Sequence, residues 1–407
     1  MRFFYALAIS AARCVIPLVA RSTKAKAFVQ GRKEVWKQLE NIPKDAKVVW
    51  MHCASLGEYE QGLPVLQGLK ATNPDYFYLV TFFSPSGYQV RSAHGVADLT
   101  TYLPWDTKKE VQRFISSVNP KMALFVKYEF WPNIIAALHN ANVPLYLIAG
   151  QFRSQQVFFK PWGSSYRQLL KEFKYLFVQN EQSLKLLQQI GISQVSISGD
   201  TRYDRVGATK TPLPFMETFV GNRKCIVAGS TWPEDEAVLI DAVVQTPNDW
   251  CWLIAPHEIN EEKIKILIAK LPQGSLRYTQ SEEAERKKCQ VLVLDTVGML
   301  SRCYAYGSIA YVGGGMGTSG LHNILEPASE GIPIVIGKNY QKFPEAKALI
   351  ELGGVISISA ADECTKQLSE LMHNDALRTE KGKQNGGFVS QNQGATEKTL
   401  SLLNQVL

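Results

Sequence analysis

Short apolar runs alternate with longer amphipathic stretches from residue 47 onward. This alternation predicts strands joined by helices, which is typical of parallel βαβ units. The expected strands are 48–53, 77–81, 122–126, 144–148, 175–178, 225–228, 252–255, 291–294, 309–312 and 334–336. Helices are expected over about 58–71 and from residues 132, 161, 181, 233, 261 and 323. The pattern therefore predicts an α/β protein with doubly wound parallel sheets.

The alternation stops at residues 205–222, where Gly207, Pro212, Pro214 and Gly221 interrupt any clear period. Glycine and proline at this density indicate a linker. A chain of 407 residues is also longer than a typical single domain. We therefore expect two Rossmann-like domains, residues 39–204 and 223–407, that face each other across a cleft, with ligands beyond the carboxyl ends of the strands.

Residues 1–38 form a separate segment in this interpretation. Phe3 to Ala20 is apolar apart from Ser10, Arg13 and Pro17. As a helix it would reach about 27 Å, just short of a typical hydrocarbon core. It could span a membrane, lie flat on one, be cleaved as a signal peptide, or be an ordinary buried helix. The basic residues that follow favour an uncleaved, membrane-associated helix with its flank in the cytoplasm.

The charge is concentrated in the same segment. Residues 1–38 hold eight basic side chains and one acid, which accounts for the whole net charge of +7, and the rest of the chain has 36 of each sign. A body without excess positive charge argues against nucleic-acid binding, whereas a local basic cluster suits an anionic membrane surface. Seven widely spaced cysteines without a CxxC pair fit a reduced compartment and no zinc site.

Two loops in the first half place an acid directly after a strand. Ser55-Leu56-Gly57-Glu58 has the spacing of a capping box, and it also places a carboxylate at a helix N-terminus, where it can accept a proton. Glu58 can serve both as a cap and as a proton acceptor only if its side chain turns away from the backbone. Glu129 lies between Tyr128 and Phe130, so it either faces solvent or meets a ligand hydroxyl or a basic side chain.

Two loops in the second half suit a nucleotide. Ser230 and Thr231 precede a helix, where hydroxyls and free N–H groups can bind phosphate, although Thr231 and Glu234 also have capping-box spacing. Residues 313–320 include five glycines, which favours close approach of the backbone to a phosphate or sugar. Asn323 and Glu326 are one helical turn apart, so an amide and a carboxylate are expected to meet the same ligand, with the carboxylate on ribose hydroxyls.

Several enzyme classes are excluded by missing motifs. The chain has no P-loop, no HExxH pair and no G-x-S-x-G elbow. The G-x-G-x-x-G match at Gly315, Gly317 and Gly320 is weak, because its strand is not the first of its domain and no acid follows at the ribose-binding distance. Group transfer from a nucleotide-activated donor remains the favoured chemistry.

The loops together resemble the 3-deoxy-D-manno-octulosonic acid (Kdo) transferases of lipopolysaccharide synthesis. The matching segments are Ser55-x-Gly57-Glu58, Glu129-x-Trp131-Pro132-Asn133, Gly199-Asp200-x-Arg202-Tyr203-Asp204, Ser230-Thr231, Pro256-His257, Asp295-Thr296-x-Gly298, Gly313-Gly314 and His322-Asn323-x-Leu325-Glu326-Pro327-Ala328. They occur in one order over nearly the whole chain.

The resemblance implies a GT-B glycosyltransferase fold and transfer of Kdo from CMP-Kdo to a lipid A precursor, with inversion and with no metal or other cofactor. It places the enzyme at the cytoplasmic face of the inner membrane, on an anionic surface. Glu58 corresponds to the proposed catalytic base, and Glu129 to a second acid that binds the acceptor or supports the site, with Ser55 and Gly57 beside them. The positions associated with the donor nucleotide are Ser230, Thr231, His257, Gly298, Gly313, Gly314, His322, Asn323 and Glu326.

The chain also departs from the family pattern. No arginine stands between Pro256 and His257, Met299 replaces a common acid, Leu321 replaces a glycine, and Lys342 replaces an asparagine. Lys338 or Lys342 is expected to supply the missing positive charge. Two alternatives stay open: a GT-B transferase that uses a UDP-sugar and a lipid-linked acceptor, and a non-catalytic nucleotide-binding scaffold at the membrane.

Overall fold

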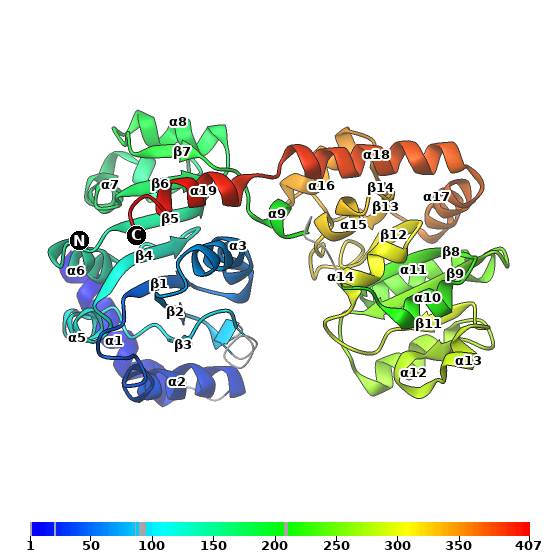
Figure 1. The fold of residues 1–407 in the computed structure, drawn as a ribbon. Helices are drawn as coiled ribbons and strands as arrows, with labels where there is room; N and C mark the ends of the chain where they lie inside the picture. The colour runs from blue at the N-terminus through cyan, green and yellow to red at the C-terminus, as the bar shows by residue number, and fades with distance from the viewer. Residues whose placement is uncertain (1, 20–21, 86, 89–94, 207–210) are drawn as a thin grey trace. The chain divides into compact units, whose positions relative to one another are not determined.

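The computed structural model describes residues 2–19, 22–85, 87–88, 95–206 and 211–407. It divides the chain into two compact units: Met1–Arg205 with Asn392–Leu407 is unit 1, and Val206–Gln391 is unit 2. Each unit contains a seven-stranded sheet whose strand pairs are all parallel. The predicted α/β class with two doubly wound parallel sheets is confirmed (Figure 1).

The sheet of unit 1 has the order β3-β2-β1-β4-β5-β6-β7. Its strands are β1 (Val48–Cys53), β2 (Phe77–Phe82), β3 (Leu99–Tyr102), β4 (Pro120–Val126), β5 (Leu145–Gly150), β6 (Tyr175–Val178) and β7 (Val195–Ile197). Its helices are α1 (Arg2–Val19), α2 (Thr23–Leu39), α3 (Leu56–Thr72), α5 (Lys108–Val118), α6 (Pro132–Asn140), η1 (Val157–Phe159), η2 (Pro161–Gly163), α7 (Ser164–Lys171), α8 (Glu181–Gln189), α9 (Arg202–Val206) and α19 (Ala395–Leu403).

The sheet of unit 2 has the order β10-β11-β9-β8-β12-β13-β14. Its strands are β8 (Lys224–Thr231), β9 (Trp250–Pro256), β10 (Leu276–Arg277), β11 (Val291–Val293), β12 (Ile309–Val312), β13 (Ile334–Gly337) and β14 (Val355–Ile358). Its helices are α10 (Pro214–Val220), α11 (Pro233–Val244), α12 (Glu261–Lys270), η3 (Tyr278–Gln280), α13 (Glu283–Arg286), α14 (Leu300–Cys303), η4 (Tyr304–Tyr306), α15 (Leu325–Ser329), α16 (Pro344–Glu351), α17 (Ala361–His373) and α18 (Asp375–Gln391).

Both faces of the unit 1 sheet are buried, which explains the continuous apolar runs of its strands. Alternate residues of β1 point to opposite faces, because the side-chain period of a strand is two. Val48 and Trp50 belong to the core under α2, α5, α6 and α7, whereas Val49 and Met51 belong to the core under α3 and α19. Loops that leave the carboxyl ends of these strands are therefore held by packing on both sides.

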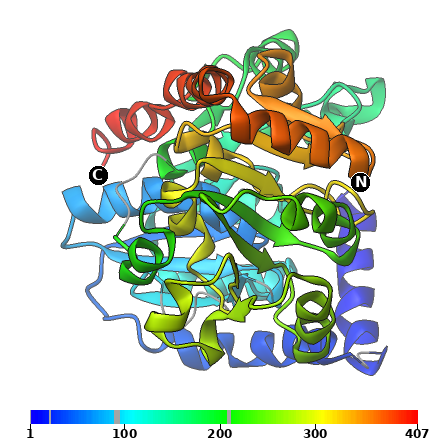
Figure 2. The same ribbon diagram turned by 90° about the vertical axis from the view of Figure 1, so that its right-hand side faces the viewer.

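The N-terminal segment is not separate from unit 1, in contrast to the expected boundary at residue 38. It forms two helices, α1 and α2, that run in different directions (Figures 1 and 2). Val35 and Leu39 of α2 are buried in the core of unit 1. Arg32, counted among the basic residues of the segment, is only 5% exposed. Among the described residues, no helix has both the length and the apolar character needed to cross a membrane.

The C-terminal boundary also differs from the predicted domain 223–407. Residues 392–407 return to unit 1, where α19 lies beside α3 (Figure 1). Asp204 holds the start of this C-terminal segment in unit 1. Its carboxylate accepts hydrogen bonds from the backbone N–H groups of Gly394 at 2.6 Å and Thr396 at 2.7 Å. Leu403 then fills the core under α3.

The expected linker 205–222 is folded in its second half. Residues 214–220 form α10, whose Met216 and Phe219 are fully buried in unit 2. The Tyr306 hydroxyl accepts a hydrogen bond from the backbone N–H of Leu213 at 2.8 Å, which ties the start of α10 to η4. Gly207 lies outside the described residues.

Candidate functional site

Two loops of unit 1 leave the sheet from neighbouring strands. β1 and β4 are neighbours in the sheet. After β1 the chain continues to β2 on one side of this pair, and after β4 it continues to β5 on the other side. Loops diverge at such a switch point, and parallel sheets bind ligands there. The loop after β1 carries Glu58, and the loop after β4 carries Glu129.

Glu58 lies in the first turn of α3. Its Oε2 atom accepts hydrogen bonds from the backbone N–H of Ser55 at 2.8 Å and from the Ser55 hydroxyl at 3.1 Å. Among the described residues, no hydrogen bond is made to Oε1 of Glu58. One carboxylate oxygen thus caps the helix while the other remains able to accept a proton, so Glu58 does not have to turn away from the backbone. The adjacent Gly57 is exposed and leaves open space beside the loop.

Glu129 does not face solvent. It is 7% exposed, and its Oε2 atom accepts a hydrogen bond from the indole N–H of Trp131 at 2.6 Å. The same oxygen lies 2.9 Å from Nε2 of His52, which is fully buried in β1. Glu129 therefore meets a basic side chain, which was one of the two alternatives left open by the sequence.

His52 belongs to a chain of polar groups inside the apolar core. The Thr81 hydroxyl accepts from the indole N–H of Trp50 at 2.8 Å and lies 2.9 Å from Nδ1 of His52. Nδ1 of His52 also lies 3.1 Å from the backbone carbonyl oxygen of Thr81, so both ring nitrogens have partners. This chain holds the Glu129 carboxylate in one position, since a buried network is stable only when all of its members are paired.

Burial raises the pKa of Glu58, and the negative charge of Glu129 raises it further. The hydrogen bonds from Ser55 and the positive charge of Lys127 act in the opposite direction but do not cancel the rise. Lys127 has a φ of 68°, an uncommon left-handed conformation for a residue with a side chain. A carboxylate with a raised pKa is a better proton acceptor near neutral pH.

Asp106 fixes the segment that carries Glu129. It is 2% exposed and accepts hydrogen bonds from the backbone N–H groups of Asn133 at 3.1 Å and Ile134 at 2.9 Å, at the start of α6. The hydroxyl of Tyr5 on α1 donates to the same carboxylate at 2.7 Å. Asp106 was not predicted from the sequence. Its partners Asn133 and Ile134 are remote in the chain, and no motif near residue 106 points to them.

Unit 2 has its own switch point, between β8 and β12. Ser230 and Thr231 end β8, and Ser230 adopts a left-handed φ of 53°. The glycine-rich loop follows β12, and His257 follows β9, the other neighbour of β8. The residues that the resemblance assigns to the nucleotide are thus on loops at one edge of this sheet.

Three aromatic rings stack beside this switch point. The Trp232 and His257 rings are 4.7 Å apart, and the His257 and His322 rings 4.3 Å apart. The indole N–H of Trp232 donates to Nε2 of His322 at 3.0 Å, so this nitrogen carries no proton. Burial, with the neighbouring His257, lowers the pKa of His322 to about 4. His322 is therefore a neutral, positioned ring at physiological pH.

Asp235 holds the glycine-rich loop in place. Its carboxylate is fully buried and accepts from the backbone N–H of Gly314 at 2.7 Å, the backbone N–H of Trp232 at 2.9 Å and the Tyr311 hydroxyl at 2.9 Å. The helix cap is therefore Trp232 with Asp235, and the expected pairing of Thr231 with Glu234 is wrong. Residues 234–236 are three consecutive acids, and nothing in the sequence distinguishes the one that turns inward.

The first glycines of the loop are required by the protein's own backbone. A Cβ atom on Gly313 would lie 2.3 Å from the carbonyl oxygen of Ser230, and one on Gly314 would lie 2.1 Å from that of Gly320. Gly314 also has a φ of 88°. Packing thus explains these two glycines without a ligand. A Cβ atom on Gly320 would lie no closer than 3.6 Å to a neighbouring atom, so the loop is more open at its far end.

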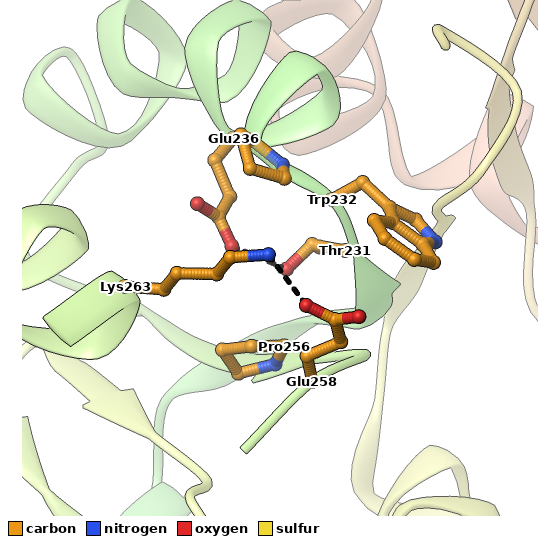
Figure 3. A pocket seen from close by; sticks show the side chains of 7 residues that line it. Thr231, Trp232, Glu236, Pro256, Glu258 and Lys263 are labelled. Carbon is orange, nitrogen blue, oxygen red and sulfur yellow. Dashed lines mark hydrogen bonds and ion pairs between the residues drawn. The ribbon is translucent and has the colours of Figure 1, made fainter. Parts of the chain in front are cut away.

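A pocket opens beside Thr231 (Figure 3). Its lining includes Trp232, Glu236 and the ion pair between Lys263 and Glu258, whose nitrogen and oxygen are 2.5 Å apart. The Thr231 hydroxyl donates to Glu236 at 3.1 Å, and burial raises the pKa of Glu236. Lys263, which sequence reasoning did not select, brings a cation to the end of β8.

Asn323 and Glu326, which were expected to meet the same ligand, contact each other directly. Nδ2 of Asn323 donates to Oε1 of Glu326 at 3.1 Å. The helix starts later than expected, however, because α15 begins at Leu325 and Oδ1 of Asn323 accepts the backbone N–H of that residue at 3.1 Å. Asn323 therefore precedes the helix, and its amide orients the Glu326 carboxylate.

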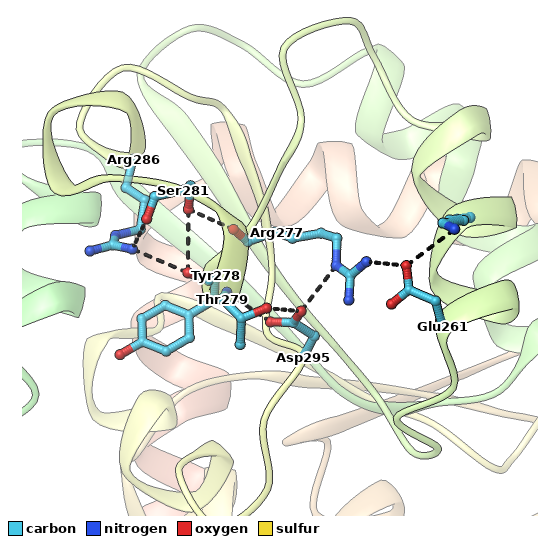
Figure 4. Close-up of polar contacts among 8 residues, drawn as sticks. Glu261, Arg277, Tyr278, Thr279, Ser281, Arg286 and Asp295 are labelled. Carbon is cyan, nitrogen blue, oxygen red and sulfur yellow. Dashed lines mark hydrogen bonds and ion pairs between the residues drawn. The ribbon is translucent and has the colours of Figure 1, made fainter.

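Asp295 stabilises the edge of the sheet from which the Gly298 loop leaves (Figure 4). Its carboxylate accepts hydrogen bonds from Nε of Arg277 at 3.0 Å and from the backbone N–H of Thr279 at 3.0 Å. Burial acts to raise the pKa of Asp295, but the bonds from Thr279 and Arg277 hold it below its ordinary value. Gly298 is exposed and has a φ of 86°, which favours glycine.

The two lysines expected to replace the missing arginine are both exposed. Lys338 follows β13 and Lys342 precedes α16. Neither lines the pocket beside Thr231, whereas Lys263 does.

The comparisons with known proteins agree with one another. Residues 27–205 match the family model described as 3-deoxy-D-manno-octulosonic-acid transferase (kdotransferase). The 3-deoxy-D-manno-octulosonic acid transferase of Haemophilus influenzae is 24% identical over 88% of this chain and 87% of its own length, and that of Bordetella pertussis is 25% identical over 88% and 87%. The UDP-GlcNAc 2-epimerase of Neisseria meningitidis, solved with UDP-GlcNAc, shares the fold over 88% of this chain and all of its own, with 15% identity and a TM-score of 0.61.

The family match covers the loops that hold Glu58 and Glu129, and the relatives extend over both sheets. Two units that each hold a parallel seven-stranded sheet, together with the structural neighbours, give the GT-B glycosyltransferase fold. The family model and the curated relatives together support a 3-deoxy-D-manno-octulosonic acid (Kdo) transferase, which is a glycosyltransferase.

Proposed function

We propose that this glycosyltransferase moves Kdo from CMP-Kdo to a lipid A precursor, with Glu58 as the general base. The observation that carries the proposal is the Glu58 carboxylate: it lies at the switch point of unit 1, one of its oxygens has no hydrogen bond from the described residues, and burial raises its pKa. The relatives that bear the Kdo transferase name support the sugar and the reaction class.

In the proposed reaction, the acceptor hydroxyl gives its proton to Glu58 while its oxygen bonds to the anomeric carbon of Kdo. The bond from that carbon to the phosphate oxygen breaks, and CMP leaves with the electron pair on the opposite face, so the configuration inverts. Glu129, which cannot move because His52 and Trp131 hold it, raises the basicity of Glu58 and supports the acceptor side.

Unit 2 holds the nucleotide in this proposal. The phosphate lies beside the Ser230 and Thr231 loop in this proposal, whereas Gly313 and Gly314 allow the loops to pack together. The neutral ring of His322, oriented by Trp232, adds a face for the donor. His257 stacks on the same indole, and Gly298 leaves its loop without a side chain. Asn323 presents Glu326 to the ribose hydroxyls.

The donor class is tested by nucleotide release. Purified protein is incubated with a lipid A precursor and either CMP-Kdo or a panel of UDP-sugars, and free CMP or UDP is measured. Release of CMP that requires the lipid supports the proposal. Release of UDP would instead favour the UDP-sugar transferase, and release from no donor by a protein that still binds nucleotide would favour the scaffold.

We predict that kcat/KM rises with pH around a midpoint that is higher than the ordinary pKa of a glutamate. A general base works only when it is deprotonated, and burial together with Glu129 raises the pKa of Glu58 above its ordinary value of 4.5. Activity should therefore rise with pH through a midpoint above that value. A pH–rate profile of the Glu129→Gln variant checks the cause, because loss of the neighbouring charge should move the midpoint down. A midpoint that does not move would remove Glu129 from this role.

We also predict that Glu326→Ala weakens CMP binding by about 1.5–3 kcal/mol, the range for a hydrogen bond to a charged group. The amide of Asn323 orients this carboxylate, so its loss should cost affinity and leave the fold intact. Calorimetry with CMP measures the change, and Glu351→Ala on α16 is the control, since Glu351 is an exposed acid of the same unit. Equal affinities in the two variants would make Glu326 a packing residue only.

The position in the cell also belongs to the proposal. The relatives synthesise lipopolysaccharide, which implies a membrane-associated role. We place the protein on the cytoplasmic face of the inner membrane, held there by the basic N-terminal helices on an anionic surface. Removal of residues 1–38 is not a clean test of this, because it would also remove Val35 from the core of unit 1.

A further inference from the structure

A second pocket in unit 1 is lined by three cations and two indoles. Its lining residues are Arg13, Val29, Arg32, Lys33, Trp36, Trp105 and Glu110. They come from α1, from α2, from the loop after β3 and from α5.

Arg32 is the residue of this pocket that most needs a partner. It is 5% exposed, and its two terminal nitrogens donate to the carbonyl oxygens of Phe28 at 3.1 Å and Phe83 at 2.9 Å. Its Nε atom is buried without a hydrogen-bond partner, and among the described residues no carboxylate lies within ion-pair distance of it. Burial lowers the pKa of Arg32 to about 9, because the opposing effects of Tyr102 and Glu110 do not offset the cost of burying the charge.

Aromatic rings compensate this charge only in part. The guanidinium lies 3.7 Å from the ring centre of Phe28, 4.7 Å from that of Phe83 and 5.3 Å from that of Trp105. Cation–π contacts stabilise a cation, but a carboxylate or phosphate would do so more strongly. The arrangement leaves the positive charge of Arg32 beside an opening, and no carboxylate of the described residues forms an ion pair with it.

Glu110 does not supply that anion. It is the single acid of the lining, and its Oε1 atom already pairs with Arg13 at 3.0 Å, while Oε2 accepts the backbone N–H of Trp105 at 3.1 Å. Glu110 therefore acts on Arg32 only at a distance, and among the described residues neither Arg32 nor Lys33 forms an ion pair at the pocket. Trp36 and Trp105 give it apolar walls, which suit the carbon stem that carries a phosphate group.

The source of the anion follows from the helix that forms one wall. Leu7 and Val15 of α1 are 60% and 52% exposed, and Arg13 lies between them in the sequence. Helices with exposed apolar residues and basic residues lie at the surface of anionic bilayers. We propose that the pocket between α1 and α2 binds the phosphate of an anionic lipid headgroup; this rests on the membrane association proposed above, and not on the transfer reaction.

The test compares two lysines of α2. Lys33 lines the pocket, whereas Lys37, one turn further along, is also exposed but does not. Binding of the full-length protein to phosphatidylcholine vesicles doped with phosphatidylglycerol is measured by co-sedimentation for Lys33→Gln and Lys37→Gln. We expect Lys33→Gln to weaken binding about fivefold, the equivalent of roughly 1 kcal/mol per charge. Lys37→Gln should cost clearly less, with the melting temperature of both variants unchanged.

Each outcome decides the question. An equal loss of vesicle binding in the two variants would mean that general surface charge, and not the pocket, attracts the membrane. Membrane association would then be supported, and the phosphate site in the pocket would be contradicted. Displacement of the protein from the vesicles by inorganic phosphate at constant ionic strength, in wild type but not in Lys33→Gln, would support a phosphate site. Binding to inorganic phosphate without any binding to vesicles would identify a soluble anion and overturn the lipid assignment.

Discussion

Glu58→Gln is expected to lower kcat by about a hundred- to ten-thousand-fold, the usual contribution of general base catalysis. The amide oxygen of glutamine can still accept the backbone N–H of Ser55, which Glu58 accepts at 2.8 Å. The cap of α3 should therefore survive, with the melting temperature and the affinity for CMP nearly constant. Steady-state kinetics, thermal unfolding and calorimetry on the same preparation check the three expectations.

A matched control for this experiment is Glu397→Gln. Glu397 lies in the first turn of α19, also in unit 1, and is exposed. The same chemical change at an equivalent helical position should leave turnover unaltered. If Glu58→Gln instead unfolded at a lower temperature and kept its turnover, Glu58 would be a cap only, and Glu129 would become the next candidate for the base.

Asp235→Ala should have the largest effect on unit 2. The carboxylate is fully buried, and its removal leaves the backbone N–H groups of Gly314 and Trp232 and the hydroxyl of Tyr311 without an acceptor. Each buried unpaired donor costs about 1–3 kcal/mol, so we expect a loss of about 3 kcal/mol or more in the free energy of unfolding. CMP binding should weaken as well, because the glycine-rich loop loses its anchor.

The measurement is denaturant unfolding together with CMP calorimetry. Asp241→Ala provides the control, since Asp241 lies on the same helix and is exposed. That variant should differ from wild type by no more than about 0.5 kcal/mol, as surface substitutions usually do. An Asp235→Ala protein as stable as wild type would show that the loop does not depend on the carboxylate.

Much of the fold could be predicted because buried parallel strands appear in a sequence as apolar runs. Strands such as Val48–Cys53 and Ile309–Val312 are covered on both faces and were found for this reason. The edge strands β3, β7, β10 and β14 were missed, because they are short or partly exposed and their sequences alternate less clearly. The position of α19 could not be predicted, because it depends on a contact with Asp204 from another part of the chain.

The candidate site was predictable to a similar extent. Loops after strands pointed to Glu58 and Glu129, but the groups that position them are remote in sequence. His52 left a signal that could have been used, since it is a polar residue in an otherwise apolar strand and therefore needs a buried partner. Asp235 left none, because it lies between Glu234 and Glu236 and only the structure distinguishes the buried acid from its neighbours.

The most direct test of the central claim is the product itself. Purified protein is incubated with CMP-Kdo and a lipid A precursor, the lipid is analysed by mass spectrometry, and CMP release is measured in the same sample. The account predicts a lipid whose mass has increased by Kdo, with one CMP released for each sugar transferred, and almost no product with Glu58→Gln. An unmodified lipid from a folded protein that binds CMP, or equal product from wild type and Glu58→Gln, would contradict it.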